Sequence, residues 1–151
     1  MVCIHPCFWT SMDEIKNVEQ MRMIYTRARN KHEIEVQAQK VPTSVTQNWM
    51  SQLPPNSFLA DVLNYKPDES KENGVLYYKQ VKAAALGMLL FMRNVYNHAN
   101  TKNLGRGVQL NLNELQETLY CIYPEFMSNF VEQIFDITEM REALKASTTD
   151  E

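Results

Sequence analysis

The sequence is poor in the residues that interrupt regular structure. Its 151 residues include only 4 Gly and 6 Pro, which leaves room for long periodic segments and favours helices over a sandwich of many short strands. Apolar residues make up 44% of the chain, a content that excludes a disordered protein. A chain of this length typically buries about 70% of its unfolded surface. One domain therefore needs no disulfide or metal ion to hold it together.

Positive charge and clustered metal ligands are also scarce. The net charge is −3, so the overall electrostatic field does not attract nucleic acid, and RNA binding would need a local basic patch. The three cysteines contain no C-x-x-C pair and the three histidines are scattered, whereas a structural zinc site needs about four organised ligands. We therefore expect reduced thiols, no metal and no cofactor.

The sequence lacks a hydrophobic run long enough to cross a membrane. The apolar residues near the N-terminus are interrupted by His5, Pro6 and the charges that begin at Asp13. This pattern predicts neither a signal peptide nor a transmembrane helix. The expected location is the cytoplasm, with the nucleus as the alternative.

The spacing of apolar residues predicts an all-α fold, a single compact domain of six or seven helices around a central buried helix. Residues 1–146 are expected to form this domain, and residues 147–151 a frayed tail. Polar stretches at 66–74 and 103–107 are expected to be loops. The first expected helix runs from Ser11, with Glu14 completing a capping box, to about Lys40, and two short helices follow from caps near Thr43–Ser44 and Asn56–Ser57. The central helix is expected from Tyr77 to Asn100. Two more are expected, one from a cap at Asn111 or Asn113 and one from Pro124 through Phe135.

The strongest helical pattern lies in residues 77–100. Positions 83–92 are apolar on every side of the helix, and such a helix is normally central and buried. Four polar residues follow. At about 100° per residue, Arg93, Asn97, Asn94 and His98 lie within roughly 140° of one another. A central helix that carries Arg, amides and imidazole on one face is expected to meet a polar cleft or a partner there.

These residue types are suited to cleaving RNA without a metal. A general base removes the proton of the ribose 2′-OH, which attacks the adjacent phosphate, and a general acid protonates the departing 5′-oxygen. Histidine has a pKa near neutrality for the acid role, and the planar fork of arginine donates to two phosphate oxygens at once. Because DNA lacks the 2′-OH, the expected partner is RNA and not DNA.

The spacing of Arg93 and His98 is weak evidence by itself. Arg27 and His32 have the same R-x-x-x-x-H spacing, in a charged stretch that we interpret as solvated helix surface. Arg93 and His98 have a structural interpretation as well, with Arg93 in a surface ion pair and His98 as a cation at a helix C-terminus.

The residues around Arg93 and His98 resemble the kinase-extension nuclease (KEN) domain. This domain follows the kinase domain in the unfolded-protein-response sensor kinase/ribonuclease and in ribonuclease L. Four matches fall in the family's order over about residues 5–135. They are His5-Pro6-Cys7-Phe8-Trp9 for H-P-x-F-W, Trp49 and Leu53 for W-x-x-x-L, Leu89-Leu90 with Arg93-Asn94 and His98 for L-L-x-x-x-R-N-x-x-x-H, and Tyr123-Pro124-x-Phe126 for an aromatic-Pro-x-Leu segment.

The resemblance implies a helical nuclease of the HEPN type that cleaves single-stranded RNA loops without metal as a homodimer and leaves a 2′,3′-cyclic phosphate. It makes His98 the general acid, and Asn94 and Arg93 the residues that position the phosphate. The family's base is a tyrosine upstream of the R-N pair. Tyr78 is the preferred counterpart and Tyr77 the alternative, about two residues out of register, and one of this pair can equally be a packing aromatic.

Two other interpretations remain open. Ala99-Asn100-Thr101 replace the basic and aromatic residues that follow the family's histidine, and the family's D-x-S-D-R motif is missing. These departures favour a catalytically silent KEN-like module for protein interaction or dimerisation. An unrelated helical adaptor is the third interpretation. If the chain cleaves RNA, Lys102 and Arg106 are the expected contacts to the RNA backbone.

Overall fold

The described part of the molecule is helical throughout. The computed structural model describes residues 6–65, 78–101 and 111–149, and no strand occurs in these ranges. Within these ranges lie eight α-helices and two 3₁₀ helices. They are η1 (Pro6–Phe8), α1 (Ser11–Arg27), α2 (Lys31–Gln39), α3 (Thr43–Thr46), η2 (Trp49–Gln52), α4 (Phe58–Leu63), α6 (Ala84–Thr101), α7 (Leu112–Ile122), α8 (Phe126–Ile134) and α9 (Thr138–Thr149).

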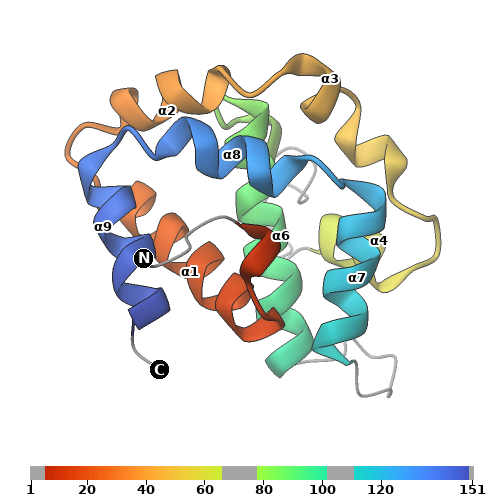
Figure 1. The fold of residues 1–151 in the computed structure, drawn as a ribbon. Helices are drawn as coiled ribbons and strands as arrows, with labels where there is room; N and C mark the ends of the chain where they lie inside the picture. Colours follow the sequence, from red (N-terminus) through yellow and green to blue (C-terminus); the bar gives the residue numbers. More distant parts are fainter. Residues whose placement is uncertain (1–5, 66–77, 102–110, 150–151) are drawn as a thin grey trace.

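Helix α6 is the centre of a single domain. It runs through the middle of the bundle (Figure 1) and contacts α1, α2, α3, α4 and α7. Its fully buried side chains point in most directions around the helix axis; they include Leu86, Leu89, Phe91 and Val95. The prediction of an all-α domain around a central apolar helix is therefore confirmed. No described helix combines the length and the apolarity that crossing a bilayer requires.

The helix predicted from Ser11 to Lys40 is two helices. Ala28 has an extended backbone, with ψ 134°, which ends α1 and lets the chain turn into α2. A straight helix of thirty residues would be about 45 Å long and would carry its second half away from the core. The turn instead buries Ile34 and Ala38 of α2 in the same core as Val18 and Met21 of α1.

Three of the predicted helix caps lie within one residue of their predicted positions, whereas neither Thr43 nor Ser44 caps α3, whose N-cap Pro42 makes no side-chain hydrogen bond. Thr10 caps α1 in place of Ser11, and its Oγ1 accepts a hydrogen bond of 3.1 Å from the backbone N–H of Asp13. The carboxylate of Asp13 accepts in return from the Thr10 N–H at 2.9 Å, which completes a capping box. Ser57 caps α4 and Asn111 caps α7, as predicted.

The C-terminal part of the chain holds a helix that was not predicted. After α8, Ile137, Met140 and Leu144 are buried, and α9 packs along α1. Helix α9 extends to Thr149 and so includes part of the segment 147–151 that was expected to fray. The split of α1 from α2 and the addition of α9 account for a helix count above the six or seven expected. The predicted loops at 66–74 and 103–107 lie outside the described residues.

Phe91, in the middle of α6, forms a cluster with three aromatic side chains from other segments. The Trp49 ring lies 5.3 Å from Phe91, 5.9 Å from Tyr78 and 6.4 Å from Tyr123, measured between ring centroids. The Tyr123 hydroxyl donates a hydrogen bond to the backbone carbonyl of Trp49, and burial raises the pKa of this phenol above its usual range. This aromatic cluster fixes η2 and α7 against α6.

Candidate functional site

Arg93 is held between α1 and its own helix. Its Nε donates to Oε2 of Glu19 at 2.9 Å, and its Nη1 donates to Oδ1 of Asn94 at 3.1 Å. The side chains of Arg93 and Glu19 are 26% and 39% exposed, so the pair is open to solvent. Glu19 also lies 3.5 Å from the guanidinium of Arg22. Two of the five N–H donors of Arg93 are used by these bonds.

Asn94 turns toward the segment that precedes α6. Its Nδ2 donates to the Tyr78 hydroxyl at 2.8 Å. Tyr78 is 4% exposed and belongs to the aromatic cluster with Trp49 and Phe91. Arg93, Asn94 and Tyr78 therefore form one chain of hydrogen bonds from the surface pair with Glu19 into the core.

Gly87 brings the Tyr78 segment close to α6. Tyr77 was predicted to begin the central helix, but α6 starts at Ala84, and the chain turns between Tyr78 and that point. A Cβ added at Gly87 would lie 3.1 Å from the backbone carbonyl oxygen of Tyr78, tighter than ordinary contact. Glycine allows this approach, and the approach places the Tyr78 hydroxyl beside Asn94.

His98 lies one helical turn after Asn94, in the last turn of α6. Its half-buried ring packs edge-on against Tyr65, with centroids 4.6 Å apart and an interplanar angle of 67°. Tyr65 directly follows α4 and its cap, Asn64, so the imidazole is positioned by a different element from the one that holds Arg93. A histidine cation here would also interact favourably with the helix C-terminus.

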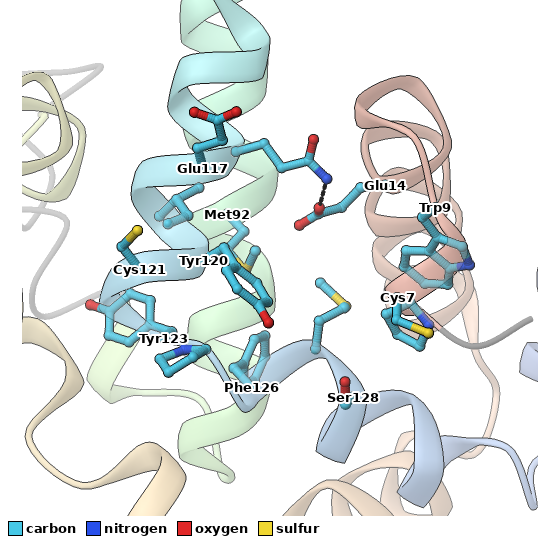
Figure 2. Close-up of a pocket in the computed structure, with 15 residues that line it drawn as sticks. Cys7, Trp9, Glu14, Met92, Glu117, Tyr120, Cys121, Tyr123, Phe126 and Ser128 are labelled. Carbon is cyan, nitrogen blue, oxygen red and sulfur yellow. Dashed lines mark hydrogen bonds between the residues drawn. The ribbon is translucent and has the colours of Figure 1, made fainter.

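The predicted polar face thus divides into two sides. Arg93 and Asn97 line a pocket of about 320 Å³ together with Glu19, Met12 and Leu112. Asn94 and His98 face Tyr78 and Tyr65 instead. A larger pocket of about 490 Å³ lies between η1, α7 and α8 (Figure 2) and contains none of the four predicted catalytic residues. The Arg93–Asn94 hydrogen bond joins the two sides.

The R-x-x-x-x-H copy at Arg27 is solvated, as predicted. Arg27, Arg29 and His32 are exposed. Arg27 is the last residue of α1 and His32 lies in the first turn of α2, with the non-helical residues 28–30 between them. The two side chains of this copy therefore do not share a helix face.

Two residues near the candidate site were not predicted. Glu19 lies in the charged helix α1, and Tyr65 precedes the polar stretch 66–74. Neither has a local sequence signal, because each contacts a partner more than 30 residues away along the chain. Tyr77, Lys102 and Arg106 lie outside the described residues.

Metal ligands are not grouped in the part of the chain that the structure describes: no three His, Cys, Asp or Glu side chains lie together there. No protein-family model matches the chain, and neither a curated protein nor a solved structure matches it significantly.

Proposed function

We propose that the C-terminal half of α6 is the centre of a metal-independent endoribonuclease that cleaves single-stranded RNA loops and acts as a homodimer. The observation that carries this proposal is the hydrogen-bonded pair of Arg93 and Asn94, 3.1 Å apart, one turn before His98. The hydrogen bond joins the guanidinium, which lines the pocket of about 320 Å³, to the amide on the side of His98, and both groups keep N–H donors for a phosphate.

The proposed reaction is a transesterification in which the strand is cut without water. A base takes the proton of the 2′-OH, the 2′-oxygen bonds to phosphorus, and the bond from phosphorus to the 5′-oxygen breaks. His98 donates a proton to the departing 5′-oxygen, and the products are a 2′,3′-cyclic phosphate and a 5′-OH. Arg93 and Asn94 stabilise the negative charge that develops on the phosphorane oxygens.

We assign Tyr78 to positioning Asn94 in place of the base role that the resemblance implies. Its hydroxyl is buried at the end of the Asn94 hydrogen bond, whereas a general base must approach the proton that it removes to within hydrogen-bond distance. Because Tyr78 holds the Asn94 amide in place, the amide needs little reorganisation when negative charge develops on the phosphate.

A second function is favoured by the contact between Arg93 and Glu19. The Glu19 carboxylate occupies the Nε donor of the guanidinium at 2.9 Å, and so it competes with a phosphate for Arg93. In this interpretation the residues are structural, and the chain is a catalytically silent helical module that pairs with another protein or with a second copy.

One experiment separates the two functions. A stem-loop RNA and its 2′-deoxy counterpart are incubated with the chain over a range of protein concentrations, with a chelator present. The nuclease predicts chelator-resistant cutting of the ribose substrate alone, a cyclic-phosphate product, and a rate that rises more steeply than linearly with protein concentration. His98→Ala should abolish the cutting, while the matched variant His32→Ala leaves it unchanged. If no RNA is cut at any concentration, the silent module is the correct function.

A further inference from the structure

The pocket of about 490 Å³ has the size and the walls of a small-molecule site. Sites for small ligands typically have volumes of roughly 300–1,000 Å³ and are mostly apolar with a few polar groups. This pocket is formed where the N-terminal segment, α6, α7 and α8 meet, with Trp9, Tyr120, Phe126 and Met127 among its walls. Figure 2 shows Tyr120 and Trp9 on opposite sides, with Glu14 between them.

The charge of the pocket is negative. Glu14 and Glu117 line it, and none of the described lining residues is Lys, Arg or His. An anionic ligand would therefore find two carboxylates and no cation at this position. The electrostatics of the pocket select for a positively charged occupant.

Glu14 is the polar centre of the pocket. Its Oε1 accepts a hydrogen bond of 3.1 Å from the Tyr96 hydroxyl, and its Oε2 accepts from the side-chain amide of Gln116. Both partners are neutral, and burial raises the pKa of Glu14 in spite of these two hydrogen bonds. Glu14 is half-buried, and removing a carboxylate from water is costly unless it is paired with a cation. A carboxylate has about four acceptor positions, so two hydrogen bonds leave acceptor capacity for a ligand.

The aromatic walls add a second attraction for the same class of ligand. A cation above the face of Trp or Tyr is attracted by the ring quadrupole. Tyr120 is 68% exposed, unusual for a large aromatic side chain in this protein, and it lies beside the pocket. Met127, beside the fully buried Phe126, is half-buried, so its side chain offers apolar surface to the body of a ligand.

From this geometry we infer that the pocket between η1, α7 and α8 binds a small organic cation with an aromatic or aliphatic body, whose ammonium group pairs with Glu14. The site is separate from the proposed ribonuclease centre. Its occupancy does not require that the chain cleave RNA.

Three indole probes that differ in charge test this inference. Tryptamine carries an ammonium group, tryptophol a neutral hydroxyl, and indole-3-propionate a carboxylate. Binding is followed by the NMR signal of the Met127 methyl group in the full chain. We expect tryptamine to shift this signal in a saturable manner, with at least tenfold higher affinity than tryptophol, and we expect no saturable shift with indole-3-propionate.

Variants identify the residue that binds the ammonium group. Glu14→Gln should weaken tryptamine at least tenfold and leave tryptophol unchanged, while Glu117→Gln, an exposed carboxylate on the same pocket, should weaken tryptamine less than threefold. Tyr120→Ala removes an exposed ring without disturbing the core and should weaken both probes. Equal affinities for tryptamine and tryptophol would overturn the inference. So would the absence of any shift at millimolar concentration, or unchanged tryptamine binding in a folded Glu14→Gln variant.

Discussion

The two R-x-x-x-x-H segments of this chain have the same spacing, but one is exposed to solvent and the other lies in a helix packed against the core. From Arg27 to His32 the chain leaves one helix and enters another, and both side chains are exposed. From Arg93 to His98 it stays within α6, where Asn94 is tied to the aromatic cluster and His98 to Tyr65. A short motif thus obtains a site-like geometry from the packing of its helix, and the spacing itself contributes little.

The largest expected difference between the two segments is in the free energy of unfolding, because the Arg93–His98 segment rests on the aromatic cluster and the Arg27–His32 segment does not. Trp49→Ala removes the ring that contacts Tyr78, Phe91 and Tyr123 and should lower the free energy of unfolding by about 3–5 kcal/mol. Arg27→Ala should change it by less than about 0.5 kcal/mol. Urea unfolding of both variants measures the difference. Comparable losses would show that the aromatic cluster does not stabilise α6.

The next comparison concerns RNA cleavage. If Arg93 stabilises charge on the phosphate, Arg93→Ala should reduce the cleavage rate by about 10²–10³-fold, the usual effect of removing one such donor. Arg27→Ala is the matched control and should cleave at the unaltered rate. The assay uses the stem-loop substrate at saturating concentration. Equal rates for the two variants would remove Arg93 from the site.

The sequence was sufficient to predict the buried part of the central helix, though not its start at Ala84, because the apolar pattern is local. Ten consecutive apolar positions require a buried environment, and the caps at Ser57 and Asn111 depend on neighbours two to three residues away. The break at Ala28 was missed because no Gly or Pro marks it. It arises from the burial of Ile34 and Ala38 against other helices, which a local pattern does not record.

The candidate site was predicted in part for the same reason. Helical geometry placed Arg93, Asn94 and His98 near one another, since they share one helix. It did not reveal that Glu19 would hold Arg93 from α1, or that His98 would pack on Tyr65. Those partners come from distant elements, and their identity depends on how the helices cross.

A smaller effect is expected from the hydroxyl that holds Asn94. Tyr78→Phe keeps the ring in the aromatic cluster and removes the acceptor of the 2.8 Å bond from Asn94, so it should cost about 1 kcal/mol of folding free energy. Near the first segment, Tyr25 donates to Glu35 over a longer 3.3 Å. Glu35 keeps its ion pair with Lys82 when that hydroxyl is removed, so Tyr25→Phe should cost less. Urea unfolding measures both, and the side-chain amide NMR signals of Asn94 should move in Tyr78→Phe alone. A larger cost for Tyr25→Phe would reverse the comparison.

A further small effect on stability tests whether Glu19 competes with the RNA phosphate for Arg93. Glu19→Gln weakens an ion pair whose side chains are partly exposed, so the free energy of unfolding should fall by no more than about 1 kcal/mol. If Glu19 competes with the RNA phosphate for Arg93, the same variant should cleave RNA several-fold faster at low ionic strength, where charge interactions are least screened. Glu33→Gln, an exposed carboxylate beside His32, is the matched control and should leave cleavage unchanged. Faster cleavage by both variants would reflect reduced overall repulsion of RNA. Unchanged cleavage by Glu19→Gln would show that the Arg93–Glu19 pair persists when RNA binds, in which case Asn94 and His98 contact the phosphate without the guanidinium.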